Sequence, residues 1–225
     1  MFVAIPAPRR NDAAMTEQQP TSLRERQKED RKARIIAAAK SLFLEAGLEK
    51  ITMEAIAEIA GVSSVTVHNY YGTKSGVLLA LVAESDRELL ATLERGLRER
   101  GETLTDRVLG FFEIVCRHTQ THLDKAIWRQ VIAASVSGTE PRFGKLYHEL
   151  DNRLASVLIR EVERMVGAGL LPETVDPAHL GWALFNLQNA RFIEFIAAEG
   201  SGCEAGLQHL RNDLNALMPG GFPGR

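Results

Sequence analysis

Glycine and proline punctuate residues 23–218 only at wide intervals, and this spacing restricts the elements that the chain can form. Between these points apolar side chains recur every three or four residues, which is the period of an amphipathic α-helix. The alternation typical of a half-buried strand is absent. The helices that this pattern predicts span residues 31–46, 53–60, 64–71, 75–100, 103–122, 125–137, 142–167, 177–199 and 203–217. The sequence therefore predicts an all-α protein of about nine helices.

The two ends of the chain lack this periodicity. Residues 1–22 are polar and include three prolines, so we expect a disordered arm, in which Met15 is an alternative start of translation. Residues 219–225 are rich in glycine and proline and are expected to form a disordered tail. The part between them is expected to divide into a first domain at residues 23–75 and a second domain at residues 76–218.

Charge distinguishes these two domains. The whole chain holds 27 basic and 29 acidic residues and is therefore nearly neutral. Residues 24–74 hold nine basic and seven acidic residues, whereas residues 75–225 hold 16 basic and 20 acidic residues. The basic excess predicts an anionic partner for the first domain only.

Composition excludes several other classes of protein. Apolar residues make up 45% of the chain and charged residues 25%, as in ordinary globular proteins. Two cysteines, Cys116 and Cys203, are too few for a disulfide scaffold and suit a reducing compartment. No apolar run approaches the ~20 residues of a membrane span, and the apolar residues 1–8 are followed by Arg9 and Arg10 rather than by the core of a secretion signal. We therefore expect a cytoplasmic protein with no membrane partner.

Residues 52–71 have the pattern of a helix-turn-helix. Thr52 is suited to cap the helix that follows it, because its hydroxyl can accept a hydrogen bond from a free backbone amide. The next turn needs a residue that tolerates positive φ, which Gly61 supplies, and Ser63 can cap the second helix. Two helices joined by such a tight turn are the arrangement that places a recognition helix in the major groove of DNA.

The second of these helices predicts which side chains contact DNA. Val67 and Tyr71 lie one turn apart and are expected to face inward. The side chains left facing outward are Ser64, Val65, Thr66, His68, Asn69 and Tyr70. Their polar groups can bind phosphates or base edges, and Val65 can contact a thymine methyl group. Further phosphate contacts are expected from Lys74 and from a basic arm that consists of Arg24, Arg26, Lys28, Arg31 and Lys32.

Residues 34–82 resemble the DNA-binding domain of TetR-type (TetR/AcrR) transcriptional regulators. The resemblance lies in Thr52, Ile56-Ala57, Ala60-Gly61-Val62-Ser63, Thr66, Tyr70-Tyr71, Lys74 and the helix at 78–81. It implies a three-helix DNA-binding domain followed by a helical bundle that binds a ligand and forms a homodimer. It also implies that phosphates are held by Thr52, Thr66, His68, Tyr70 and Lys74. Val65 and His68 depart from the small residue and the tyrosine that are common in the family, so no operator sequence follows from the resemblance.

The second domain contains candidates for a lever and for a dimer interface. Helix 75–100 is roughly 37 Å long at 1.5 Å per residue and begins beside the recognition helix, so it can connect the two domains. Helix 177–199 is apolar on all sides and needs cover on all sides. A second apolar seam, on helix 203–217, consists of Leu207, Leu210, Leu214 and Leu217. We expect these last two helices to form a homodimer interface about a two-fold axis, although a monomeric bundle could also cover helix 177–199.

Aromatic side chains of the second domain can line an effector cavity. The candidates are Phe111, Phe112, Trp128, Phe143, Tyr147, Trp182, Phe185 and Phe192, with Asn186, Gln188 or Asn189 as polar contacts, and Phe112, Trp128, Tyr147 and Phe185 are favoured among the aromatic residues. For each aromatic residue the alternative is an ordinary place in the core. Asn186 and Asn189 are the favoured polar contacts, because buried amides in so apolar a helix need partners. No charge pattern selects a cationic or an anionic ligand, which favours a small, mostly apolar effector.

The sequence lacks the motifs of catalysis and of nucleotide binding, namely Gly-x-Ser-x-Gly, the phosphate loop and Gly-x-Gly-x-x-Gly. His118 and His122 have a spacing that can hold a metal on a helix. Cys116 lies on another side of that helix and the glutamate of a zinc-protease motif is missing, so we expect two partly exposed histidines and no metal. We also expect no enzymatic activity and no cofactor.

Together these expectations describe a ligand-responsive DNA-binding regulator in the bacterial cytoplasm, associated with the nucleoid. Two copies would bind double-stranded DNA at a pseudo-palindromic operator, and a small-molecule effector would splay the lever helices and release the DNA. Repression is the commoner outcome in the resembled family. The alternative is a helical small-molecule-binding or enzymatic module in which the helix-turn-helix is vestigial.

Overall fold

The protein is described by a computed structural model, which covers residues 22–46, 50–137, 141–200 and 202–218. The expected arm at residues 1–21, the expected tail at residues 219–225 and the helix end at Gly47 lie outside these described residues.

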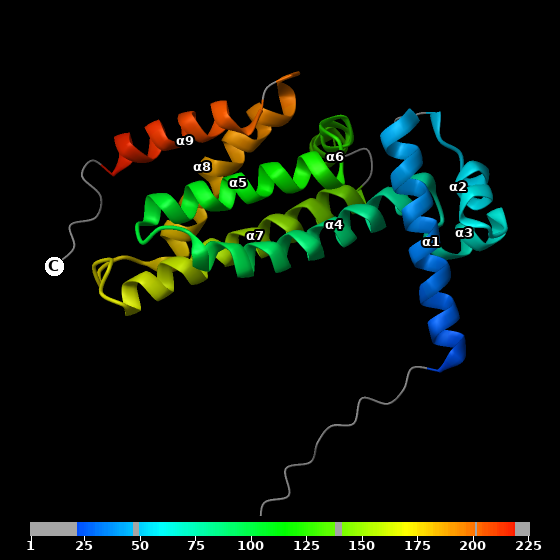
Figure 1. Cartoon of the computed structure of the whole chain (residues 1–225), viewed down its shortest axis with the longest axis horizontal. Helices are drawn as coiled ribbons and strands as arrows, with labels where there is room; N and C mark the ends of the chain where they lie inside the picture. Colours follow the sequence, from blue (N-terminus) through cyan, green and yellow to red (C-terminus); the bar gives the residue numbers. More distant parts are fainter. Residues whose placement is uncertain (1–21, 47–49, 138–140, 201, 219–225) are drawn as a thin grey trace, which may run out of the picture.

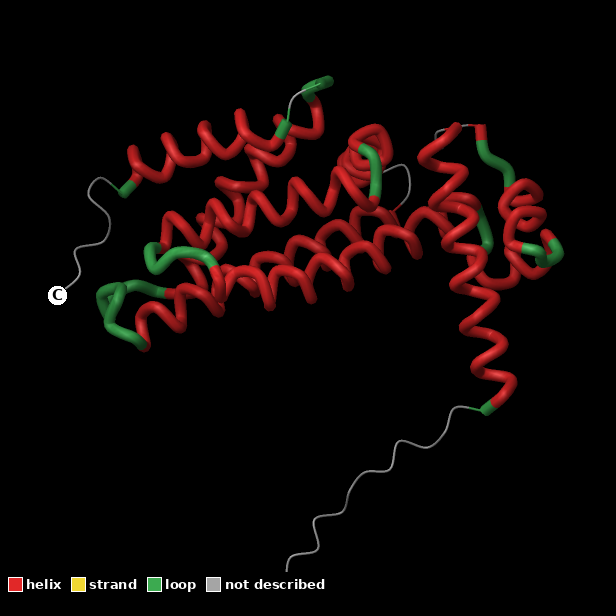
Figure 2. The backbone as a smooth tube through the Cα atoms, in the orientation of Figure 1, coloured by secondary structure: helices red, strands yellow, loops and turns green. Residues whose placement is uncertain are grey.

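Helices make up almost all of the described part of the chain (Figure 2). They are α1 (Leu23–Ala46), α2 (Met53–Ala60), α3 (Ser64–Tyr71), α4 (Lys74–Gly96), α5 (Leu104–His122), α6 (Lys125–Ser137), α7 (Pro141–Gly167), α8 (Pro177–Ala197) and α9 (Cys203–Leu217). A short 3₁₀ helix, η2 (Leu97–Glu99), continues α4. The predicted all-α class and its nine helices are confirmed for these residues.

The start of α1 differs most from the prediction. The helix begins at Leu23 rather than at residue 31, because Ser22 and Glu25 form a capping box. The Ser22 amide donates to the Glu25 carboxylate at 2.8 Å, and the Glu25 amide donates to the Ser22 hydroxyl at 3.3 Å. The residues expected to form a basic arm therefore lie in a helix, the stem of α1 that projects beyond α2 and α3 in Figure 1.

The helices form two groups that share α4. Helices α1, α2 and α3 gather at one end of the molecule, and α4 runs from them into a bundle with α5–α9 (Figure 1). The first group is centred on buried Ile35, Ile56 and Val67, and α4 supplies Val77 and Leu81 to its core side. A single helix thus carries the connection between the two groups.

Close packing of α7 against α8 organises the bundle. A Cβ atom at Gly181 would lie 2.7 Å from the Cα atom of Ile159, so only glycine permits this approach. Arg191 of α8 then binds Asp213 of α9, with Nε–Oδ2 and Nη2–Oδ1 distances of 2.6 and 2.8 Å. This bidentate pair fixes α9 against α8.

Helices α8 and α9, which were expected to form the dimer interface, expose fewer large apolar side chains than predicted. Helix α8 carries apolar side chains on all sides, although those at its outward positions are mostly small and are interrupted by polar ones. These positions are Ala183, Asn186, Ala190, Ile193, Glu194 and Ala197. On α9, Leu210 and Leu214 are fully buried in the protomer's own core, so they are not free for a partner, whereas Leu217 is exposed. None of the described helices is both long enough and apolar enough to cross a membrane.

Candidate DNA interface and effector pocket

The turn between α2 and α3 is built by capping residues at each helix end. The Thr52 hydroxyl accepts a hydrogen bond from the Ala55 amide at 3.1 Å, which starts α2. Gly61 ends α2 with φ 64° and ψ 40°, the left-handed conformation that favours glycine. Its amide donates to the carbonyl oxygen of Glu58, and α3 begins three residues later.

Helix α3 is short but is capped at both ends. The Ser63 hydroxyl accepts a hydrogen bond from the Thr66 amide at 3.2 Å and lies 2.9 Å from the Thr66 hydroxyl. At the other end the Gly72 amide donates to the His68 carbonyl oxygen at 2.8 Å. The β-branched residues of α3 are weak helix formers, so these caps and the burial of Val67 stabilise the helix.

The outer surface of α3 carries most of the side chains predicted to contact DNA. His68 and Asn69 are exposed, Val65 is 64% exposed, and Ser64 and Thr66 are half-buried. The His68 Nδ1 atom lies 3.0 Å from the Gly72 carbonyl oxygen and must donate to it, because a carbonyl only accepts. The Nε2 atom of His68 is therefore the nitrogen that remains for DNA.

Tyr70 does not face fully outward as expected. It is half-buried against the core, and its hydroxyl accepts a hydrogen bond from Arg31 Nε of α1 at 3.2 Å. Tyr71, expected to be buried, is half-buried and contacts the Tyr70 ring edge-on, with centroids 6.2 Å apart. Arg31 and Tyr70 thus join α1 to α3, and both remain at the surface that α3 presents.

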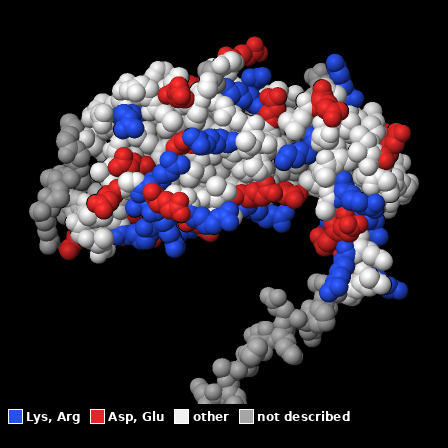
Figure 3. Space-filling model, viewed as in Figure 1, with Lys and Arg blue, Asp and Glu red and all other residues white. Residues whose placement is uncertain are grey.

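The basic stem of α1 also carries acidic side chains. Lys32 pairs with Glu29 at 2.8 Å, and Arg34 pairs with Asp30 at 3.4 Å. Figure 3 shows this alternation of basic and acidic groups along the stem. Lys74 lies at the first position of α4, immediately after Thr73, whose hydroxyl caps that helix by accepting from Gly76 at 3.1 Å.

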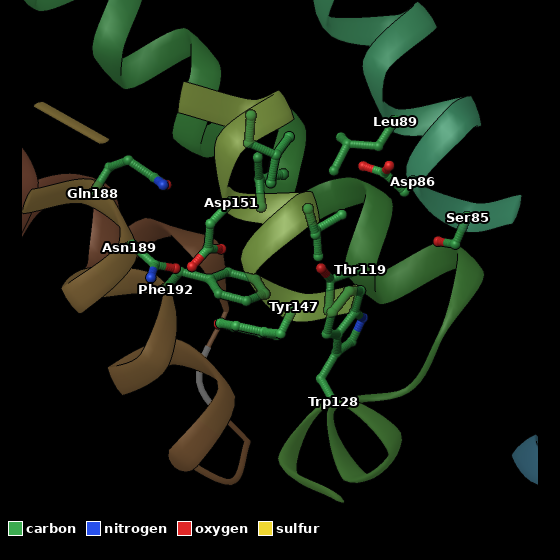
Figure 4. Close-up of a pocket in the computed structure, with 13 residues that line it drawn as sticks. Ser85, Asp86, Leu89, Thr119, Trp128, Tyr147, Asp151, Gln188, Asn189 and Phe192 are labelled. Atoms are coloured by element: carbon green, nitrogen blue, oxygen red, sulfur yellow. The ribbon is translucent and has the colours of Figure 1, made fainter. Parts of the chain in front are cut away.

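A pocket lies inside the bundle, between α4, α5, α6, α7 and α8 (Figure 4). Its free volume is only about 30 Å³, so an effector must displace side chains in order to enter. Three aromatic residues line it, Trp128, Tyr147 and Phe192, and the rings of Trp128 and Phe192 meet edge-on with centroids 6.0 Å apart. Asp86 of α4 and Asp151 of α7 lie on opposite walls in Figure 4.

Both carboxyl groups are perturbed by burial. The Asp86 side chain is 1% exposed, and burial raises its pKa to about 6, although the Arg153 guanidinium, 2.9 Å away, opposes this shift. Burial also raises the pKa of Asp151 to about 6, against the opposing effect of His148. Burial, followed by the nearby Asp151, raises the pKa of Tyr147 to about 12.

Buried polar atoms in the same pocket lack partners. Trp128 Nε1, Gln188 Oε1 and Asp86 Oδ1 have no hydrogen-bond partner among the described residues. Buried polar atoms in native proteins are almost always hydrogen-bonded, so water or a polar ligand is expected to meet these three atoms. The pocket therefore offers aromatic faces, two carboxyl groups and unsatisfied polar atoms together.

The predicted effector contacts are only partly found here. Trp128, Tyr147, Gln188 and Asn189 line the pocket, and Tyr147 forms a hydrogen bond with Asn189. Phe112, Phe185 and Asn186 do not line it, which corrects the expectation.

Each of these three residues lies elsewhere for a physical reason. Phe112 is fully buried against α9, where a Cβ atom at Gly206 would lie 2.7 Å from its ring. Phe185 packs edge-on against Trp182 with centroids 5.6 Å apart, and Asn186 is exposed on the outer side of α8.

Sequence reasoning missed Asp86 and Asp151. Asp86 lies on the apolar stripe of α4, four residues after Val82 and three before Leu89, where a carboxylate is out of place. A carboxylate at such a position could have been recognised from the sequence as a candidate site residue. The expectation for His118 was also wrong, because this residue is buried at 6% exposure rather than partly exposed.

The fold and the capped turn define a helix-turn-helix DNA-binding regulator, and comparisons with known proteins agree. Residues 35–81 match the family model described as bacterial regulatory proteins, tetR family. The HTH-type transcriptional regulator BetI of Cronobacter sakazakii (strain ATCC BAA-894) is 29% identical over 187 residues, which cover 76% of this chain and 92% of that protein. BetI of Stenotrophomonas maltophilia (strain R551-3) is 28% identical over 137 residues, which cover 60% of this chain and 69% of that protein.

Solved structures show the same fold. A TetR-family regulator from Rhodococcus sp. superposes with a TM-score of 0.64 at 17% identity, covering 84% of this chain and 98% of that one. A transcriptional regulator from Saccharomonospora viridis, in complex with choline, superposes with a TM-score of 0.62 at 19% identity, covering 84% and 96%. Residues 35–81 of the chain thus match the tetR family, and the chain as a whole has the fold of TetR-family regulators.

Replacement of Asp86 by Asn is expected to change how stability depends on pH. The native protein binds a proton at Asp86 up to about pH 6, whereas the unfolded chain loses it near 3.8. The wild-type free energy of unfolding should therefore fall, relative to that of Asp86→Asn, as pH rises from 4 to 6. Because one pKa unit corresponds to about 1.4 kcal/mol, the relative loss is up to about 3 kcal/mol.

Urea unfolding of the wild type and of Asp86→Asn between about pH 4 and pH 7 measures this difference. Glu149→Gln, at an exposed carboxylate, is the matched control and should show a flat difference across the range. A difference for Asp86→Asn that stays constant, or that grows in favour of the wild type as pH rises, would contradict the assignment.

Proposed function

We propose that this TetR-type regulator is a repressor that binds a pseudo-palindromic operator as a homodimer and is released by a small organic cation. The cationic effector is inferred from the pocket, in which the buried carboxyl group of Asp86 and the half-buried carboxyl group of Asp151 lie with three aromatic rings. This proposal keeps the small effector expected from the sequence but adds a positive charge. In this assignment residues 23–75 form the DNA-binding domain and residues 76–218 the effector and dimer domain, and the protein acts at the nucleoid in the cytoplasm.

The pocket suits a cation that carries apolar groups. Aromatic faces attract cations within about 6 Å of a ring centroid, and this attraction strengthens where water is excluded. The carboxylates of Asp86 and Asp151 supply the balancing negative charge, and Asn189 and Gln188 supply hydrogen-bonding groups. Choline, which the S. viridis regulator holds, combines these chemical features and is a suitable first probe.

Effector binding would act on α4 through the Asp86–Arg153 pair. This pair joins α4 to α7, and a second pair, Glu94–Arg160 at 3.4 Å, joins the same helices nearer the end of α4. A cation that enters beside Asp86 competes with Arg153, so the contact that holds α4 in place is weakened. Because α4 begins directly after the helix-turn-helix, its displacement changes the separation of the two recognition helices.

The homodimer would form through the outer side of α8 and the adjoining part of α9. Ala183, Ala190 and Ala197 lie on this side at spacings of seven residues, which bring small side chains to the same face. Small residues allow two helices to approach closely, and exposed Ile193 and Leu217 add apolar area. Asn186, predicted as an effector contact, would then lie in the dimer interface.

In DNA binding, α3 would supply the contacts to bases. Val65 and Asn69 would contact base edges in the major groove. Ser64, Thr66 and His68 would contact the DNA at the same groove. Thr52, Lys74 and the Arg31–Tyr70 pair would hold phosphates on either side. Retained DNA binding separates this function from the alternative of an enzymatic or binding module with a vestigial helix-turn-helix.

Lys74→Ala should weaken binding to every DNA sequence by a similar factor and should lower the slope of log K against log salt by about 1, because a phosphate contact carries no sequence information. Asn69→Ala should instead change the preferred base at one operator position, by about 1–3 kcal/mol. Fluorescence anisotropy on single-base operator variants at several salt concentrations measures both effects.

Lys145→Ala is the control for loss of a positive charge, because the Lys145 side chain is exposed on α7, away from the helix-turn-helix. If Lys74→Ala and Asn69→Ala had the same effect at every operator base, the division between phosphate and base contacts would be wrong. If the wild type showed no salt-sensitive, sequence-dependent binding, the vestigial alternative would hold.

The effector class is tested with choline, tetramethylammonium and the uncharged carbon isostere of choline. Binding of the cations, followed by calorimetry, should exceed that of the isostere by about tenfold or more, which corresponds to about 1.4 kcal/mol from charge. Asp151→Asn should remove most of this preference while leaving DNA binding unchanged. Saturating cation should also release operator DNA.

Equal affinity for the cation and its isostere, or no binding of any quaternary ammonium, would contradict the cationic effector. DNA binding that persists unchanged at saturating cation would contradict its role in release. Neither result would affect the assignment of α3 as the recognition helix.

A further inference from the structure

A second group of side chains joins α4 to α5 outside the effector pocket. Glu88 of α4 and His118 and His122 of α5 each present a ligand atom within 4.8 Å of the other two. The two imidazole rings are stacked, with centroids 3.7 Å apart and an interplanar angle of 17°. The spacing of four residues on α5 puts both rings on the side of the helix that faces α4.

The hydrogen bonds of His122 leave a lone pair opposite a carboxylate. Its Nδ1 atom lies 2.8 Å from the Thr121 hydroxyl and 3.1 Å from the His118 carbonyl oxygen, and a proton on Nδ1 satisfies that carbonyl, which only accepts. In the neutral ring Nε2 then bears a lone pair, and it lies 3.0 Å from the Glu88 carboxylate. Two acceptors at this distance repel each other unless a positive charge lies between them.

An orientation of this kind is typical of histidines that bind metals. Such histidines usually donate the second ring N–H to a carbonyl or carboxylate, which fixes the tautomer and directs the other nitrogen to the metal. His118 is buried at 6% exposure. Its Nε2 atom lies 2.9 Å from the Ser85 hydroxyl and also points toward α4.

An opening leads to this group from the side of α1. A hollow of about 480 Å³, part of it open to solvent, is lined by Glu84, Glu88 and His122 and by Lys40 of α1. Glu84 lies one turn before Glu88 and adds negative charge, whereas Lys40 contributes the one opposing charge among the described residues that line the hollow. An ion can therefore reach the group without passing through the core.

We propose that Glu88, His118 and His122 form a binding site for a divalent transition-metal ion of the zinc class. Two imidazole nitrogens and one carboxylate are a ligand set that zinc uses, with a fourth position left for water. The bound ion would connect the middle of α4 to the end of α5 and would favour the arrangement in which these three residues lie together. The site is separate from the effector pocket and does not depend on the proposed operator or effector.

The test uses the tag-free full-length protein, stripped with a chelator and titrated with Zn²⁺ by calorimetry. We expect one ion per chain and a melting temperature that rises by about 5–10 °C at a hundred-fold excess over Kd. Glu88→Gln and His122→Ala should each weaken Zn²⁺ binding by roughly tenfold or more and abolish the rise. Both residues are partly exposed, so these variants are expected to fold, which circular dichroism checks.

His179→Ala is the matched control, because His179 is 89% exposed, lies on α8 and also has an acidic neighbour. Co²⁺ provides an independent readout, since tetrahedral coordination by the wild type should give intense visible absorption that both variants lose. Absence of Zn²⁺ binding would show that His122 and Glu88 form only a proton-bridged pair and would overturn the proposal. Equal binding by the wild type and the two variants would overturn it too, because the ion would then lie elsewhere.

Discussion

The structure depends on one continuous helix, α4, which is shared by the DNA-binding end and the bundle. It has 23 residues and is therefore about 34 Å long. Its first turn is held against α3, because a Cβ atom at Gly76 would lie only 1.9 Å from the Tyr71 carbonyl oxygen. Its middle supplies Ser85, Asp86 and Leu89 to the pocket. A movement at the pocket would thus be transmitted along one continuous helix.

Charged residues along α4 would make the position of this helix sensitive to a bound cation. Asp86 is buried on an otherwise apolar stripe, which costs free energy when it ionises, and Arg153 offsets only part of that cost. A buried carboxylate with one partly exposed partner is a contact that a ligand cation can replace. One turn of helix separates Glu84 from Glu88, which face the hollow beside α1. Neighbouring positions of one helix therefore face two different environments, the pocket and this hollow.

Local signals in the sequence predicted most of the fold. Thr52 and Ser63 cap the helices that follow them, and Gly61 adopts the positive φ that ends α2. Because these effects are local, the first and last residues of α2 and α3 could be predicted from the sequence. The Ser22–Glu25 capping box is just as local, but Ser22 was assigned to the disordered arm and Glu25 lay within the expected basic arm, so the start of α1 was misplaced. For α9 the leucine period was correct, but period alone does not say whether Leu210 and Leu214 face the protomer or a partner.

The sites were less predictable, because they join residues that are distant in sequence. Asp86 and Asp151 meet across a pocket only after α4 and α7 have packed, and Glu88 reaches His118 and His122 from another helix. Aromatic content suggested Trp128 and Tyr147 correctly but could not separate them from Phe112 and Phe185, which fill the core. The one pocket residue that the sequence could have indicated by its position is Asp86, because it is a charged residue on the apolar stripe of α4.

Effector binding beside Asp86 is expected to move α4 and to change the separation of the recognition helices in the dimer. Spin labels at Glu58→Cys on α2, which packs against α3, follow this separation by double electron–electron resonance in a Cys203→Ser background. We expect one narrow distance distribution on operator DNA, where the recognition helices lie about 34–36 Å apart. Saturating effector should shift this distribution to a different distance as DNA is released. Release of DNA with an unchanged distribution, or a protein that shows no dipolar coupling because it is monomeric, would contradict the account.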